Sequence, residues 1–304
     1  MRRYCQDNGD YPRQLVIDLW GSQSMRTAGE EFAMALHLIG VRPLYREKTA
    51  RIDGFEILPV AMLERPRIEV TLRVSGLFRD IFGNLMSLFD QAVQALAERD
   101  EAADWNPYVG KSDTPAIFSP APEQYGVNMD SALAAMTEQS RTEAAQAWLA
   151  ASSWAYHKGR HYSDMDQIKA KVKSADAFVH LQDLKETDLL SQQDYAAHEA
   201  GFLAANSLLG GDVSAYHLDN STPQAPVARS LGEEIARVVY ARAANPQWIG
   251  SMKPHGFRGA AEIVSTLDHM AAFSHLSGLV GVHLFDQFFS HTLGDQEVAA
   301  FIET

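Results

Sequence analysis

The fold is decided by residues 65–80, which read Arg-Pro-Arg-Ile-Glu-Val-Thr-Leu-Arg-Val-Ser-Gly-Leu-Phe-Arg-Asp. Apolar and polar residues alternate from Ile68 to Ser75, as they do in a β-strand that buries one face. A glycine then breaks the alternation, and from Phe78 onward the apolar residues recur at helical spacing. The stretch predicts a strand that turns directly into a helix. Ser75 and Arg79 would lie near the carboxyl end of that strand, which is where open α/β sheets bind ligands.

The rest of the chain repeats this alternation of strand and helix. Further short apolar runs predict strands at residues 15–19, 177–181 and 214–218. Helical spacing predicts helices at residues 25–39, 78–98, 131–153, 165–172, 194–209, 231–243, 258–276 and 280–291. Strands separated by helices pair in parallel through right-handed crossovers. We therefore predict an α/β fold, a layered and mainly parallel sheet with helices, in which the strands end at one common edge.

Other segments define the domain organisation. Residues 100–130 are rich in proline and glycine, which predicts a long functional loop, and residues 155–163 are predicted to form a polar turn. Residues 55–63 predict a weaker extended segment. We expect residues 1–229 to form the α/β region with the candidate site loops, and residues 230–304 to form a helical arm packed on it.

The composition argues against several classes of protein. A net charge of -13 and a pI near 5.2 leave no basic surface for a nucleic-acid backbone. No apolar run approaches the ~18 residues of a membrane span, and the polar start is unlike a signal peptide. The single cysteine, Cys5, is typical of a reducing compartment. We expect a cytoplasmic protein without nucleic-acid or membrane partners.

A compact group of ionisable residues lies at 194–199, which reads Asp-Tyr-Ala-Ala-His-Glu. On an α-helix Asp194 and His198 share one face, with Glu199 on its flank. These side chains could hold a divalent cation or relay protons. A solvated helix start, where Asp194 is favoured by the helix dipole, explains the same pattern.

A second group lies at residues 156–162, where cationic and aromatic side chains alternate. Lys158, Arg160 and His161 are suited to bind carboxylate and amide groups of a ligand. An exposed basic loop without any ligand is an equally good interpretation. The sequence contains no GxxxxGK[ST] segment, so it has no phosphate-binding loop of its own.

Short blocks of sequence occur in a fixed order along the chain. They are Trp-Gly-Ser at 20–22, Gly-Val-Arg-Pro at 40–43, Arg-Pro-Arg-Ile-Glu-Val at 65–70, Ser-Gly-Leu-Phe-Arg-Asp at 75–80, Lys-Gly-Arg-His at 158–161 and His-Gly-Phe-Arg-Gly at 255–259. This set resembles the large subunits of the ATP-dependent tetrapyrrole metal chelatases, namely the cobaltochelatase large subunit and the magnesium chelatase H subunit. Members of the family are several times longer, so the resemblance implies a C-terminal portion of such a subunit.

The resemblance implies a function as well. Residues 155–161 and 188–195 look closer to the cobalt branch, which inserts Co²⁺, as substrate, into hydrogenobyrinic acid a,c-diamide in cobalamin biosynthesis. Separate AAA+ ATPase partner subunits use ATP and Mg²⁺, and no bound cofactor is expected on this chain. The alternatives are a magnesium chelatase H subunit acting on protoporphyrin IX, and a non-catalytic interaction module of such a subunit.

Metal insertion removes two pyrrole protons and strips water from the cation, so carboxylates and imidazoles near the ring are required. The residues that we expect to be catalytic are Glu199, Asp188, His161 and His217. Those that we expect to contact the tetrapyrrole are Lys158, Arg160, Tyr195, Arg79 and Ser75. Those that we expect to contact the metal ion are Glu199, Asp194 and His198.

Overall fold

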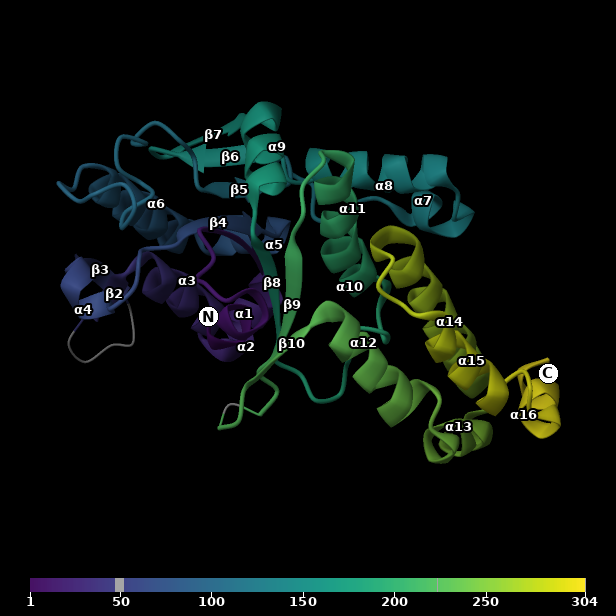
Figure 1. Ribbon diagram of the computed structural model, residues 1–304. Helices are drawn as coiled ribbons and strands as arrows, with labels where there is room; N and C mark the ends of the chain where they lie inside the picture. Colours follow the sequence, from purple (N-terminus) through teal and green to yellow (C-terminus); the bar gives the residue numbers. More distant parts are fainter. Residues whose placement is uncertain (47–51, 223, 304) are drawn as a thin grey trace.

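An eight-stranded sheet forms the centre of the computed structural model, which describes residues 1–46, 52–222 and 224–303. The strands lie in the order β10-β9-β8-β1-β4-β5-β6-β7 (Figure 1). Their bounds are β1 Gln14–Leu19, β4 Glu69–Val74, β5 Ile117–Ser119, β6 Trp154–His157, β7 Arg160–Ser163, β8 Ala177–Gln182, β9 Ser214–Asp219 and β10 Val227–Ser230. Strands β9, β8, β1, β4 and β5 are parallel, while β10, β6 and β7 run antiparallel to their neighbours. The predicted mainly parallel α/β sheet is confirmed, because the four predicted strands are adjacent and parallel.

Alternation along β1 divides the core between the two faces of the sheet. Leu15 and Ile17 pack with α3 (Glu30–Ile39) and α6 (Gly83–Ala97) on one face. Val16 belongs to the other core, with α8 (Glu138–Ala150), α11 (Gly201–Leu208) and α14 (Phe257–Ser277). Figure 1 shows these two groups of helices on opposite sides of the sheet. Each strand side chain therefore has a defined face, as the period of two requires.

The remaining elements surround this core. They are the helices α1 Arg2–Asn8, α2 Gly21–Thr27, α4 Val60–Leu63, α5 Gly76–Ile81, α7 Asp130–Ala135, α9 Met165–Ser174, α10 Gln193–Tyr195, α12 Leu231–Val238, α13 Pro246–Met252, α15 Val282–His291 and α16 Gln296–Ile302, the π-helices η1 Ala196–Ala200 and η2 Val239–Ala243, the 3₁₀ helix η3 Lys253–His255, and the hairpin of β2 Val41–Tyr45 with β3 Ile52–Ile57. Helices α12 to α16 extend from one side of the sheet toward the C-terminus (Figure 1). In the described part of the chain, no helix is long and apolar enough to cross a lipid bilayer.

Several predicted helices are interrupted where the backbone must turn. The helix predicted at 25–39 is divided by Ala28 and Gly29, which both have positive φ. The helix predicted at 78–98 divides at Phe82, and the one predicted at 131–153 divides at Met136, which has a φ of 46°. Helical spacing of apolar residues continues across these breaks, so the pattern alone could not locate them.

Three segments differ from the prediction. The polar turn predicted at 155–163 is the β6–β7 hairpin, and its two turn residues, Lys158 and Gly159, have φ of 49° and 74°, as a tight hairpin turn requires. The loop predicted at 100–130 contributes strand β5 to the sheet. The extended segment predicted at 55–63 holds the end of β3 and then helix α4.

Candidate functional site

Four ionisable side chains form a row across the sheet, one from each of four adjacent parallel strands. The strand register pairs Asp18 of β1 with Arg73 of β4 and with His180 of β8, and it pairs His180 with His217 of β9. All four are almost fully buried, each at 1% exposure or less. They share the face that carries Phe178, which packs against Phe202 of α11. The parallel register thus places these four ionisable side chains side by side, each one or two residues before the carboxyl end of its strand.

The π-helical turn η1 places two more ionisable side chains against this row. His198 Nδ1 lies 2.8 Å from Asp18 Oδ2, and Glu199 Oε1 lies 3.0 Å from His217 Nδ1. All five residues of η1 are buried. The wider turn of a π-helix, which is frequent at functional sites, lets two consecutive side chains face the sheet. The prediction of a regular helix at 194–209 is therefore wrong at Ala196–Ala200, where the structure has the π-helical turn that carries His198 and Glu199.

The Asp18 carboxylate is held ionised by its neighbours. It accepts hydrogen bonds from Trp20 Nε1 at 2.7 Å and from Arg73 Nη1 at 3.1 Å. Burial alone would raise the pKa of Asp18, but the contacts with His198, Arg73 and His180 outweigh burial and keep this pKa well below its ordinary value. Burial, together with the nearby guanidinium, lowers the pKa of His198 more than Asp18 raises it. His198 is therefore a neutral imidazole beside an ionised carboxylate.

His217 is in the opposite electrostatic state. Burial lowers its pKa, but the charge and the hydrogen bond of Glu199 outweigh burial, so the pKa of His217 is raised. Its Nε2 lies 2.9 Å from Gln182 Oε1, and Gln182 Nε2 donates to the Leu184 carbonyl at 2.9 Å. Both ring nitrogens of His217 thus face oxygen acceptors, which suits an imidazolium. The site joins a neutral and a positively charged histidine.

Two cavities open at the carboxyl edge of the sheet, on either side of the Trp20 ring. The His198 cavity, of about 140 Å³, is lined by Trp20, Ser22, Ser75, Tyr125, Asp194 and His198 among others. The His180 cavity, of about 230 Å³, is lined by Trp20, Ser22, Gln23, His180, Thr187 and Tyr195 among others. The Trp20 ring centroid lies 4.9 Å from that of His198 and 4.6 Å from that of His180. Trp20 is therefore the wall that the two cavities share.

Several residues predicted for the site are brought together here. Ser75 caps α5, and its Oγ accepts hydrogen bonds from the backbone N–H of Phe78 and of Gly21. Tyr195 stacks on Trp20 at 5.3 Å, and burial together with nearby carboxylates raises the pKa of Tyr195 to about 12. Asp194 is exposed and lines the His198 cavity.

Two other predicted residues have local partners instead. Asp188 forms a two-pronged ion pair with Arg242 of η2, in which Nη2 lies 2.9 Å from Oδ1. The Arg79 guanidinium donates to the carbonyls of Pro120 and Ala121 at 2.8 and 2.6 Å, so it anchors the segment before Tyr125. These contacts account for both side chains as tethers of neighbouring loops.

The predicted basic group lies on the β6–β7 hairpin. Because β6 runs antiparallel to β5, the turn at Lys158 lies toward the amino ends of the parallel strands. Lys158 Nζ pairs with Asp113 at 2.6 Å, Arg160 is exposed, and His161 packs against Tyr156. The structure does not bring these residues to the two cavities.

No group of three or more His, Cys, Asp and Glu side chains that could hold a metal ion occurs among the described residues. Of the three predicted metal contacts, Asp194 and His198 line one cavity, whereas Glu199 is turned to His217. A cation that reached this edge would meet two candidate ligands from the chain, Asp194 and His198, and would need its other ligands from elsewhere.

Sequence reasoning missed Asp18, His180, Arg73 and Tyr125 as members of the site. The sequence pattern places Asp18 and His180 inside apolar strands. A signal was present, because each is a lone ionisable residue inside an apolar run, one or two residues before its end. Burying such a residue is costly unless it is paired, so two such residues in neighbouring strands predict a contact.

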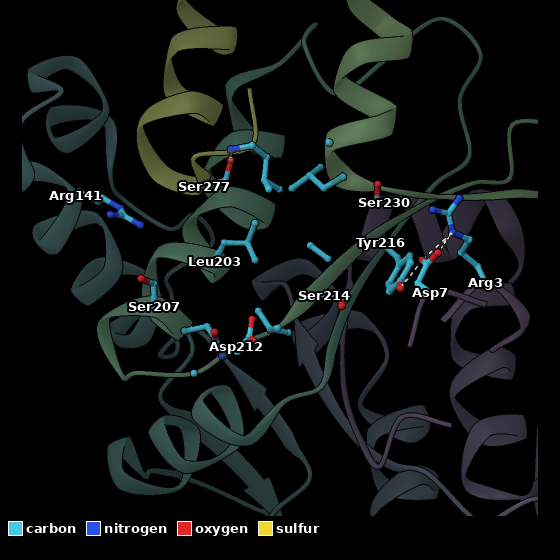
Figure 2. Close-up of a pocket in the computed structure, with 17 residues that line it drawn as sticks. Arg3, Asp7, Arg141, Leu203, Ser207, Asp212, Ser214, Tyr216, Ser230 and Ser277 are labelled. Atoms are coloured by element: carbon cyan, nitrogen blue, oxygen red, sulfur yellow. Dashed lines mark hydrogen bonds and ion pairs between the residues drawn. The ribbon is translucent and has the colours of Figure 1, made fainter. Parts of the chain in front are cut away.

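Another cavity, of about 590 Å³, lies at the amino end of β9 (Figure 2). Figure 2 shows Asp7 close to Arg3 and Tyr216, with Arg141 on the opposite wall. Asp7 accepts hydrogen bonds from Arg3 Nε and from the Tyr216 hydroxyl, both at 2.8 Å. Arg3 and Asp7 are thus paired with each other, and no histidine is among the residues that line this cavity. We place the candidate site at the smaller cavities, where the buried ionisable row ends.

Glycine at position 76 allows the Tyr125 segment to close over the His198 cavity. A Cβ at Gly76 would lie 2.4 Å from the Gln124 carbonyl oxygen and 2.8 Å from the Tyr125 ring. We expect Gly76→Ala to lower stability by about 1–3 kcal/mol, as overpacking does, and to displace Tyr125. Thermal unfolding measures the loss. Gly83→Ala is the matched control, because a Cβ there meets nothing within 4 Å; equal melting temperatures for the two variants would contradict the prediction.

The fold and the site together define an α/β protein with a buried row of imidazole and carboxylate groups at the end of a parallel sheet. The chain belongs to the CobN/magnesium chelatase family, whose family model matches residues 1–304. It is 39% identical to the aerobic cobaltochelatase subunit CobN of Pseudomonas aeruginosa, over 99% of this chain and 26% of that protein. It is 28% identical to the chloroplastic magnesium-chelatase subunit ChlH of Oryza sativa subsp. japonica, over 94% of this chain and 22% of that protein.

A solved structure is similar throughout. It is that of the catalytic subunit of cobaltochelatase from Mycobacterium tuberculosis, which superposes with a TM-score of 0.93 at 30% identity, over 99% of this chain and 27% of that one. The chain spans about a quarter of the length of the relatives that it matches. The expected resemblance to the tetrapyrrole metal chelatases is confirmed.

Proposed function

We propose that this chain acts as part of the large subunit of a cobaltochelatase, which inserts Co²⁺ into hydrogenobyrinic acid a,c-diamide while AAA+ partner subunits hydrolyse ATP with Mg²⁺. The observation that carries the proposal is the pair of imidazole–carboxylate contacts, His198–Asp18 and His217–Glu199, at the end of the sheet. The higher identity to a cobaltochelatase subunit than to a magnesium chelatase subunit favours cobalt. A cytoplasmic location belongs to the proposal, since the one cysteine, Cys5, is free.

The two pairs suit the chemistry of metal insertion. Two pyrrole N–H protons must leave the ring as the cation enters, and each needs an acceptor near the ring plane. His198 Nδ1 lies 2.8 Å from Asp18 Oδ2 and 2.9 Å from Arg73 Nη1, so contacts of the buried row hold this nitrogen. In the tautomer whose Nδ1–H donates to Asp18, Nε2 is the acceptor for a proton from a ring at the mouth of the adjacent cavity. Behind it, the Glu199 carboxylate can take up the second proton, because His217 already carries a proton on both ring nitrogens.

The cavity walls suit a flat aromatic ligand. Trp20 and Tyr125 offer aromatic surface on the His198 cavity, and Leu77 adds an apolar side chain. Asp194, exposed at the same mouth, could meet the hydrated cation as it approaches. Metal desolvation would then occur beside a carboxylate and an imidazole, which are groups that Co²⁺ accepts as ligands.

The proposal is tested by reconstituting the intact large subunit with its ATPase partners, ATP, Co²⁺ and hydrogenobyrinic acid a,c-diamide. We expect formation of the cobalt corrinoid, followed by absorbance, only when all components are present. We also expect no ATP turnover by this chain alone, because its sequence offers no phosphate-binding loop. ATP hydrolysis in a preparation free of partners would contradict this.

The same assay separates the alternatives. Preferential insertion of Mg²⁺ into protoporphyrin IX would identify a magnesium chelatase H subunit. Retained association with the ATPase partners without any binding of a tetrapyrrole would identify an interaction module. The helical arm carries the feature that favours that second candidate, since Phe257 of α14 and Val282 of α15 are 82% and 75% exposed.

A further inference from the structure

The His180 cavity concentrates polar atoms that lack partners. Among the described residues, four buried side-chain atoms make no hydrogen bond, and three of them belong to residues that line this cavity: Gln23 Oε1, His180 Nδ1 and Thr187 Oγ1. His180 Nδ1 has a longer contact of 3.5 Å with Asp18 Oδ2, and Thr187 has Tyr195 as a polar neighbour. Gln23 Oε1 has no such neighbour, and Gln23 is only 2% exposed.

The orientation of the Gln23 amide is fixed by the backbone. Its Nε2 donates to the carbonyl oxygen of Leu181 in β8. The reverse orientation would set two carbonyl oxygens against each other, so Oε1 is the free atom and it can only accept. A buried acceptor without a donor costs free energy that a suitable ligand group would recover.

We propose that the His180 cavity is a subsite for a primary carboxamide carried by the bound tetrapyrrole. The amide N–H donates to Gln23 Oε1, and the amide carbonyl accepts a hydrogen bond from Thr187 or His180. This inference rests on the proposed function, because the ring would lie across the mouth of the His198 cavity, whose volume of about 140 Å³ admits only an edge of a tetrapyrrole. The two cavities share Trp20 and Ser22, so a peripheral arm of a ring at one mouth can reach into the other.

Other ligand groups fit less well. A carboxylate only accepts hydrogen bonds, so it would repel Gln23 Oε1 in a site without a free cation. The one arginine on the cavity wall, Arg26, is already paired with Asp183 through two hydrogen bonds. That pair also occupies the carboxylate that an ammonium group would need. A neutral group that both donates and accepts is the complement of this lining.

The test measures binding of two metal-free rings to the intact large subunit. One ring bears peripheral carboxamides, and the other is the same ring with carboxylates. Absorbance titration gives the two dissociation constants. We expect the unmodified protein to prefer the amide ring about tenfold, which is the scale of one satisfied rather than unsatisfied buried hydrogen bond. Gln23→Met and, independently, Thr187→Val should bring the ratio of the two dissociation constants close to one.

Two controls keep the result interpretable. Each variant should bind the carboxylate ring with its parental dissociation constant, which shows that the site is folded. Gln287→Met, at an exposed position of α15, should leave the tenfold preference intact. Equal affinity of the unmodified protein for both rings, or an unchanged preference in both cavity variants, would overturn the subsite while leaving metal insertion untouched. Failure to bind either ring would instead overturn the proposed function and the subsite with it.

Discussion

Replacing Glu199 by Gln in the intact large subunit is expected to slow cobalt insertion by about 100-fold or more. Glu199 is fully buried, and its carboxylate holds the charge of His217 at 3.0 Å. A carboxamide of equal size keeps the shape but removes that charge, and the loss of a group in proton transfer commonly costs ~10²-fold or more. The rate is measured in the reconstituted assay at saturating ring, so that binding and chemistry are separated.

A structural effect of the same substitution must be distinguished from a catalytic one. Glu262→Gln is the matched control, because Glu262 is exposed on α14 and should leave the rate unchanged. Glu199→Gln should also cost stability, since it removes the partner of a buried imidazole. Insertion at the parental rate per folded molecule would contradict the role of Glu199, whatever its effect on stability.

The pH dependence gives an independent check of the same pair. The pKa of His217 is raised in the folded protein, so its protonation contributes stability that is fully present below its ordinary value of ~6.5. This contribution is lost as the pH rises through the raised pKa. The stability difference between the parental protein and the Glu199→Gln variant should therefore be widest below about pH 6.5 and should narrow as the pH increases.

The sequence predicted the sheet because each of its central strands carries a local signal. Apolar and polar residues alternate over residues 69–74, and a glycine follows at position 76. The segments that form β1, β8 and β9 are short and apolar. Parallel pairing follows from the intervening helices. The four strands end at one edge, as predicted, and Ser75, Tyr195 and His217 lie in the region where these strands end.

The centre of the site could not be predicted from local sequence patterns. It depends on which residues of strands far apart in the sequence lie opposite each other. Asp18 contacts Arg73 and His198, which lie 55 and 180 residues away in the sequence. No periodicity reports which residues of two strands stand opposite each other. The π-helical turn directs the side chains of His198 and Glu199 toward the sheet. It cannot be recognised from the spacing of apolar residues, because it changes that spacing for a single turn only.

The hairpin at 154–163 was misread for a different reason. Its strands are four residues each, too short for alternation to be distinguished from a polar loop, and β7 is exposed along its whole length. The first turn residue, Lys158, has a positive φ, which lysine rarely adopts. Glycine or asparagine at this position would have indicated a tight hairpin turn, and lysine does not. The prediction of Lys158 and Arg160 as ligand contacts rests on the mixture of cationic and aromatic residues and on the family resemblance, and neither gives a structural position.

Replacing Asp18 by Asn is expected to destabilise the centre of the sheet by about 3–5 kcal/mol, the usual cost of breaking a buried ion pair. The Arg73 side chain is fully buried, and without the carboxylate its remaining contacts are neutral: His198 Nδ1 at 2.9 Å, Ser152 Oγ at 3.2 Å and the Ala151 carbonyl at 3.4 Å. A guanidinium left with neutral partners alone in the core is poorly compensated. Hydrogen exchange of β1 and β4 amides in the intact subunit measures the free energy of local opening.

A double variant identifies the cause of that loss. If Asp18→Asn acts by stranding the buried charge of Arg73, then adding Arg73→Met, which removes this charge and keeps an unbranched apolar side chain, should restore much of the stability. The surface pair of Lys253 with Glu297, whose carboxylate is 83% exposed, is the matched control, and Glu297→Gln should cost less than about 1 kcal/mol. Additive losses in the double variant would show that Asp18 stabilises the sheet mainly through Trp20 and His198, and the ion pair would then be a minor part of the row.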